Sequence, residues 1–274
     1  INILGDKGEV LGIIGNTAIH LRRDEHGTEK APAVHDLWVD VGASNAQGVA
    51  KLGIRVGHPA VYQDGPMELA NRRIVGRALD NRIGGYMIAE VARLIKQNKN
   101  KLPYSLYVVN AVQEEIGLRG AEMMAQSIKP NVAIITDVCH DTTTPMIDMK
   151  IEGEIKMGKG PVITYAPAVQ NKLRELILDA ATANEIPFQR LASSRVTGTD
   201  TDAFAYSNGG VASALISLPL RYMHTTVEMV HREDVENVIK LIYESLLKIE
   251  NNEFQHQNSM TTCLKLLKVI RRQL

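Results

Sequence analysis

Two adjacent glutamates, Glu114 and Glu115, stand in the motif VQEEIG, directly after the apolar run SLYVVNA. Two ionised carboxylates at the end of a buried strand would repel each other unless a positive charge compensates them. A bound cation supplies such a charge. Because adjacent residues at a strand end point to opposite sides, one glutamate could bind a metal while the other handles the protons of a metal-bound water.

Three more ionisable residues, Asp80, Asp137 and His224, follow segments with strand-like sequences. Ligands of open α/β sheets bind outside the carboxyl ends of the strands, so residues that are far apart in the sequence can converge in one crevice. Each residue alone has a structural explanation, such as a surface pair, a helix cap or a packed histidine. Together they would concentrate too much negative charge without a divalent ion, or a pair of ions sharing a carboxylate.

Elements that position these residues can be read from the spacing of apolar side chains. Apolar residues recur at helical spacing after Asp80, which we expect near the helix cap. From residue 73 onward, strand-like runs alternate with amphipathic helices, which is typical of an α/β layer fold with a mostly parallel sheet. We expect strands at 105–112, 132–136 and 211–217, helices at 170–184 and 232–249, and a polar loop at 195–204.

The chain divides into three regions that differ in composition and in the pattern of apolar residues. Residues 1–72 are rich in glycine and short β-type runs, which predicts a small β-rich domain with Trp38 in its core. Residues 73–250 form the α/β domain, and 251–274 form a tail of uncertain role with a basic amphipathic segment. A solvated or partner-packed helix is the plainer interpretation of the tail, and a membrane-surface contact is the alternative.

Composition excludes several classes of function. Lys plus Arg and Asp plus Glu both number 31, so the net charge of zero argues against nucleic acid as a partner. The two cysteines, Cys139 and Cys263, have no metal or disulfide spacing, as expected of a reduced intracellular protein. Without a membrane-span sequence or a signal-peptide pattern at its start, we expect a soluble, cytoplasmic protein with no membrane partner.

Four motifs, ALDNRIGG, VQEEIGLRGA, ITDV and LRYMHTTVEMVHREDVENVI, occur in this order. The ordered set resembles the M42 family of metallo-aminopeptidases, which includes glutamyl aminopeptidases and the tetrahedral TET enzymes. The resemblance covers roughly residues 1–250. It implies a phosphorylase/hydrolase-like mixed sheet with flanking helices, plus a small PDZ-like dimerisation domain. It also implies peptide substrates and a homo-oligomer, from dimer to dodecamer.

The resemblance assigns roles to the ionisable residues. Asp80 would bridge two divalent ions, zinc or cobalt; Glu115 and His224 would complete one shell, and Asp137 would belong to the other. Glu114 would be the general base that takes a proton from the bridging water and passes one to the leaving amine. The family also has a histidine in an upstream HxDEIG-like segment, which this sequence lacks. The sequence therefore resembles an amino-terminally truncated member, in which the ion held by Asp137 binds weakly.

Two further residues are candidates for substrate binding. Arg221 precedes His224 and could orient a carboxylate or carbonyl group. Thr199 lies in a loop that borders the specificity pocket of the family, although a structural turn is equally compatible with the sequence. Three alternatives remain open: a related metal-dependent deacylase or carboxypeptidase, a non-catalytic oligomeric module, and an inactive truncated enzyme.

Overall fold

The computed structural model describes residues 1–15, 32–63, 65–250 and 254. They form two compact units, Ile1–Gly65 and Pro66–Leu274. The border lies several residues before the expected one, because strand β6 (Met67–Leu69) joins the sheet of the larger unit. The expected tail at 251–274 lies outside the described residues apart from Phe254, which packs against the core of the larger unit.

The smaller unit is rich in β-structure, as expected. Strand β1 (Asn2–Gly5) pairs antiparallel with β2 (Gly8–Leu11) and β5 (Ala60–Val61), and β3 (Ile13–Gly15) pairs with β4 (Trp38–Asp40). A 3-10 turn (Val34–Asp36) and helix α1 (Ala46–Lys51) complete it. The core position predicted for Trp38 is wrong, because half of this residue is exposed in the chain.

The larger unit contains a seven-stranded mixed sheet, which confirms the expected α/β class. Its order is β10 (Gln189–Ala192), β9 (Val162–Tyr165), β11 (Ala212–Arg221), β12 (Glu228–His231), β7 (Arg73–Gly76) and β6, with β8 (Val132–His140) also paired to β11. The β8–β11 and β9–β10 pairs are parallel and the others are antiparallel, so the sheet is not mostly parallel.

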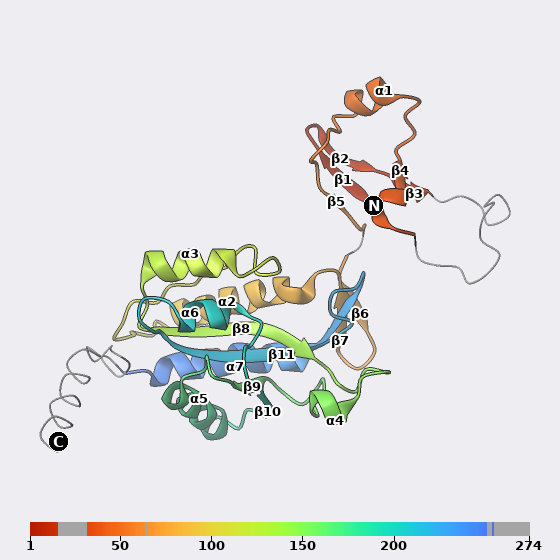
Figure 1. Ribbon diagram of the computed structural model, residues 1–274. Coiled ribbons are helices and arrows are strands. Elements are labelled where there is room, and N and C mark those ends of the chain that lie inside the picture. Colours follow the sequence, from red (N-terminus) through yellow and green to blue (C-terminus); the bar gives the residue numbers. More distant parts are fainter. Residues whose placement is uncertain (16–31, 64, 251–253, 255–274) are drawn as a thin grey trace, which may run out of the picture. The chain divides into compact units, whose positions relative to one another are not determined.

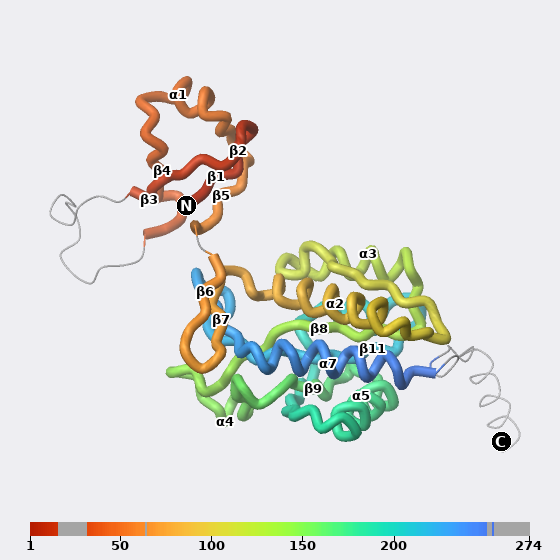
Figure 2. The backbone as a smooth tube through the Cα atoms, turned by 180° about the vertical axis from the view of Figure 1, so that it is seen from behind, coloured from red at the N-terminus to blue at the C-terminus, as the bar shows by residue number. Residues whose placement is uncertain are grey.

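Helices cover both faces of this sheet. Figure 2 shows α2 (Leu79–Gln97), α5 (Asn171–Ala183) and α7 (Arg232–Lys248) on one face, where their apolar sides enclose the main core. Figure 1 shows α3 (Arg119–Ile128) and α6 (Asp200–Ala205) on the other face. The predicted helices are thereby confirmed, whereas the loop expected at 195–204 contains α6. A short helix, α4 (Met149–Glu152), follows β8. Over the described ranges, no helix is long and apolar enough to span a membrane.

The strand predicted at 105–112 is wrong, because residues 105–112 lie in no strand. Instead, this segment and β8 line the same cavity of about 810 Å³. Backbone groups of a strand need a neighbouring edge within hydrogen-bonding distance, and no strand among the described residues pairs with this segment. Leu106, Tyr107 and Val108 remain partly exposed as a result.

Candidate metal centre

Strand directions in the larger unit explain why distant residues meet. Strands β7 and β11 both pair antiparallel with β12, so they run in the same direction and end at the same edge of the sheet. Asp80 follows the end of β7, and His224 follows the end of β11. Glu114 and Glu115 lie just before α3, at the cleft that both of these loops border.

Asp80, Glu115 and His224 form a compact cluster. The Nε2 atom of His224 lies 3.0 Å from a carboxylate oxygen of Asp80 and 3.2 Å from one of Glu115. One ligand atom from each residue lies within 4.8 Å of the other two. Imidazole and carboxylate donors without a thiolate suit zinc, cobalt or manganese, and three protein ligands leave a position for substrate or water. The donor set therefore fits a hydrolytic divalent ion.

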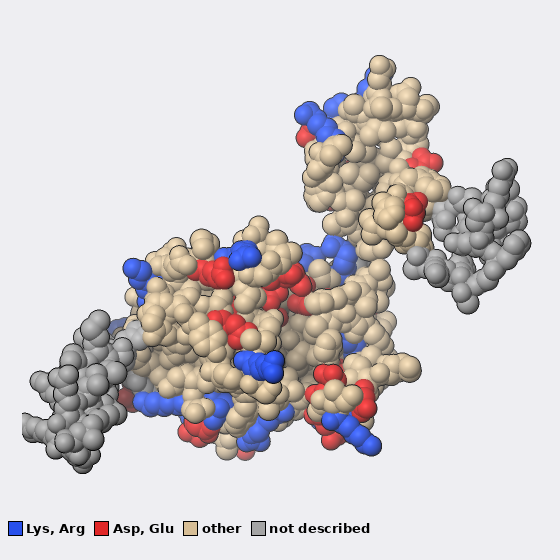
Figure 3. Space-filling model, viewed as in Figure 1, with Lys and Arg blue, Asp and Glu red and all other residues tan. Residues whose placement is uncertain are grey.

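The raised pKa values of acids in the cleft also favour a bound cation. Burial, with the charges of Glu115 and Glu228, raises the pKa of Asp80 to about 6, although His224 opposes the shift. Burial and neighbouring carboxylates, Glu115 first, raise the pKa of Glu114 to about 7. Figure 3 shows Asp and Glu side chains gathered on the face of the larger unit that this view presents. Acids crowded in this way hold protons more strongly, and a bound cation would remove that conflict.

Comparison with known proteins shows which family the chain belongs to. Residues 1–241 match the family described as M42 glutamyl aminopeptidase. The chain belongs to the M42 peptidase family. The resemblance noted in the sequence is thus confirmed, and with it the expected class of enzyme, a peptidase.

Individual relatives support the assignment. The lysyl aminopeptidase of Pyrococcus furiosus is 36% identical over 254 residues, which are 93% of this chain and 71% of that protein. The structure of an aminopeptidase from Desulfurococcus kamchatkensis aligns with a TM-score of 0.83 and 31% identity over 94% of this chain and 70% of that one. The TET1 peptidase of Pyrococcus horikoshii aligns with a TM-score of 0.73 and 25% identity, over 90% and 71% of the two chains.

Asp137 occupies a different position in this M42 chain from the one expected. It lies within β8 instead of at its end, because the strand continues to His140. Its Oδ1 accepts hydrogen bonds from the Asn81 side chain at 3.0 Å and from the backbone of Val138 at 2.8 Å. Burial raises its pKa to about 8 despite the Val138 N–H, and the charge of Asp80 adds to the shift.

The second expected shell, made by Asp80 and Asp137, is less complete than the first. Both residues line the cleft with Glu114, Glu115 and His224. However, within the described part of the chain, the cluster of three potential ligands includes Asp80 but not Asp137. The roles assigned to Asp137 and to a second ion therefore stay predictions.

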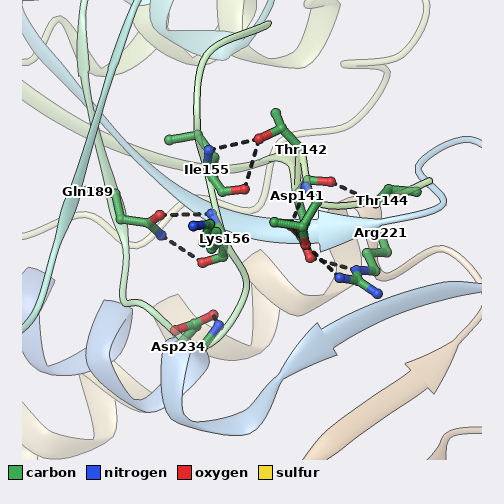
Figure 4. Close-up of polar contacts among 10 residues, drawn as sticks. Asp141, Thr142, Thr144, Ile155, Lys156, Gln189, Arg221 and Asp234 are labelled. Atoms are coloured by element: carbon green, nitrogen blue, oxygen red, sulfur yellow. Dashed lines mark hydrogen bonds and ion pairs between the residues drawn. The ribbon is translucent and has the colours of Figure 1, made fainter. Parts of the chain in front are cut away.

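Both predicted substrate-binding residues already have polar partners within the chain. Thr199 lines the cleft, but it caps α6, and its hydroxyl contacts Thr197 and Thr201. Arg221 donates to buried Asp141 at 2.6 Å and to Thr143, as Figure 4 shows for the pair with Asp141. The substrate roles of both residues stay predictions.

Two residues that support the site were not identified as functional from the sequence. Asn81, rather than Asp80, caps the regular part of α2: its Oδ1 accepts from the Gly84 backbone at 2.9 Å while its amide holds Asp137. Glu228 accepts from the backbones of Asp80 and His224. Both residues stand inside motifs that carry the family resemblance, and this was the available signal: Asn81 directly follows Asp80, and Glu228 comes four residues after His224.

Proposed function

We propose that this chain is a metal-dependent aminopeptidase, which hydrolyses the amino-terminal peptide bond of peptides. The convergence of Asp80, Glu115 and His224, with Glu114 beside them in one cleft, carries the proposal. The lysyl aminopeptidase and the other aminopeptidases to which the chain is similar supply the reaction class.

Asp80, Glu115 and His224 would hold one divalent ion, zinc or cobalt. When bound, such an ion supplies Lewis acidity, which polarises a carbonyl group and makes water a better nucleophile at neutral pH. Asp137 would share a second, weaker ion with Asp80, because no group of three potential ligands among the described residues includes Asp137.

Glu114 would act as the general base. Its carboxyl group is partly buried in the cleft, next to the ligand Glu115, and it takes part in none of the ligand contacts of the cluster. It would accept a proton from the attacking water and deliver one to the leaving amine. No side-chain nucleophile is required for such a hydrolysis, which leaves proton transfer as the work of this residue.

Assembly and location complete the proposal. The TET1 peptidase to which the chain is similar can assemble into a tetrahedron or a large octahedral shell. We propose a homo-oligomer here as well, with the smaller unit as a PDZ-like dimerisation domain, since it exposes Ile13, Val34 and Trp38. A cytoplasmic location, with peptides as substrates, is part of the same proposal.

Glu114→Gln tests the reaction assignment. A well-placed general base contributes about 10²–10⁴-fold to rate, so we expect kcat to fall by that factor while metal content stays unchanged. The assay is hydrolysis of a panel of aminoacyl p-nitroanilides after dialysis against zinc or cobalt, with bound metal quantified per chain. Glu122→Gln, an exposed acid on α3, is the matched control and should leave both values unchanged.

The same panel separates the alternatives. Turnover of N-acylated amino acids or of carboxy-terminal peptide bonds, with unblocked aminoacyl substrates untouched, would favour a deacylase or carboxypeptidase. Bound metal without any turnover would favour an inactive module. Full activity of Glu114→Gln would contradict the role of that residue.

A further inference from the structure

Glu228 is the first residue of β12, and only 2% of it is exposed. Both of its carboxylate oxygens accept a backbone hydrogen bond: Oε2 from the N–H of Asp80 at 2.8 Å and Oε1 from the N–H of His224 at 3.0 Å. One buried side chain therefore joins the backbones of two ligands that lie far apart in the sequence.

Strand pairing explains why Glu228 reaches both loops. Strand β12 lies between β7 and β11, with Glu228 opposite Gly76 and Met229 opposite Arg221. Both neighbouring strands end there, and their chains continue to Asp80 and His224. The start of β12 is thus the place from which a single carboxylate contacts both departing loops.

The loop that carries His224 depends on such contacts. His224 has a left-handed backbone conformation, with a φ of 60°, which is uncommon for a residue with a side chain. Thr225 closes the turn on one side, since its hydroxyl contacts the carbonyl oxygens of Tyr222 and Val227. The bond from the N–H of His224 to Glu228 attaches the same turn to the sheet.

We propose that Glu228 is a positioning residue of the metal centre, which sets the separation of Asp80 and His224 by holding their backbone N–H groups. Glu228 is buried and lies outside the cluster of three potential ligands, so it acts through the ligands and does not join them. The inference rests on the proposed function, because it requires that Asp80 and His224 bind an ion.

The chain contains a matched control for a purely structural role. Asp234, labelled in Figure 4, is 1% exposed and also joins two backbone N–H groups, those of Gly158 at 2.6 Å and Gly160 at 2.7 Å. None of these three residues belongs to the three-residue cluster or lines its cleft. Removing either carboxylate should destabilise the fold, but only the loss of Glu228 should weaken metal binding.

The experiment compares Glu228→Gln, Glu228→Asp and Asp234→Asn with the unmodified chain. Affinity for Co²⁺ is measured by competition with a chromophoric chelator, the visible Co²⁺ spectrum reports ligand geometry, and Tm reports stability. Substituting groups that orient metal ligands typically costs 10–100-fold in affinity, so we expect a loss of about that size for both Glu228 variants. Their spectra should also change. Asp234→Asn should bind Co²⁺ within about twofold of the unmodified chain.

The two Glu228 variants separate position from charge. Gln removes the charge and one acceptor, whereas Asp keeps the charge but is too short to hold both N–H groups. A normal affinity in Glu228→Asp would overturn the positioning role, as would an equal loss of affinity in Asp234→Asn. If Glu228→Gln does not fold, Glu228→Asp decides alone. Failure of the unmodified chain to bind Co²⁺ would instead contradict the proposed function.

Discussion

Arg221→Met should destabilise the larger unit far more than the loss of an ordinary surface ion pair. Asp141 is fully buried, and its Oδ2 accepts a hydrogen bond from the Nε of Arg221 at 2.6 Å. Its Oδ1 accepts hydrogen bonds from the backbone N–H and the hydroxyl of Thr143. Without the guanidinium, Oδ2 becomes a buried charge with no donor. Breaking a buried pair in this way costs about 3–5 kcal/mol of the free energy of unfolding.

The control is Arg232→Met. Arg232 lies 2.9 Å from Glu68, but both side chains are largely exposed, so the pair should be worth only about 0–1 kcal/mol. Both variants are measured by urea unfolding at pH 7, in parallel with the unmodified chain. A loss in Arg221→Met that does not exceed the loss in Arg232→Met would refute the conclusion that Arg221 compensates the buried charge of Asp141.

The pH dependence gives a second check. Burial opposes ionisation of Asp141, but hydrogen bonds from Thr143 and Arg221 outweigh it and hold its pKa below the usual value. A depressed pKa adds stability above the unfolded value of about 3.9, and this stability is lost as pH falls through the folded pKa. In Arg221→Met, burial prevails and raises that pKa. The deficit should therefore be largest at pH 7 and shrink as the pH falls toward the unfolded value.

Two further substitutions test the packing around the site. Gly120→Ala should lower Co²⁺ affinity and kcat together, because the added Cβ would lie 2.4 Å from the carbonyl oxygen of Val112 and would displace the segment that carries Glu115; wild-type affinity would contradict this. Leu218→Ala, at a fully buried position in β11, should cost about 2–5 kcal/mol in urea unfolding, and a loss below about 1 kcal/mol would contradict its place in the core.

Much of the larger unit could be predicted from local sequence patterns. The helices at 170–184 and 232–249 have apolar stripes long enough to specify both type and position, and they appear as α5 and α7. Strand β11 was likewise visible as a long apolar run. In contrast, the apolar run at 105–112 predicted a strand that is absent, because pairing depends on a neighbouring edge that no local pattern reveals.

The candidate site shows the same limit. Residue types after strand-like segments placed Asp80, Glu115 and His224 in one crevice with Glu114 and Asp137, and only the family resemblance singled out these three as one ligand set. The position of Asp137 was not predictable, because the strand that holds it continues past the polar residue. The engagement of Arg221 by Asp141 was also hidden, since it depends on β8 and β11 running side by side with His140 opposite Leu220.

The bond between the N–H of Asp80 and Glu228 spans 148 positions of sequence. We expect contacts of such separation to form late in folding, because the entropic cost of closing a long loop comes before the free energy that the contact contributes. We therefore expect the carboxylate and imidazole ligands to come into register only after β7, β11 and β12 have paired. During refolding, the appearance of metal affinity would thus mark the completion of the sheet, and a partly folded chain would be unable to sequester an ion or cleave a neighbour.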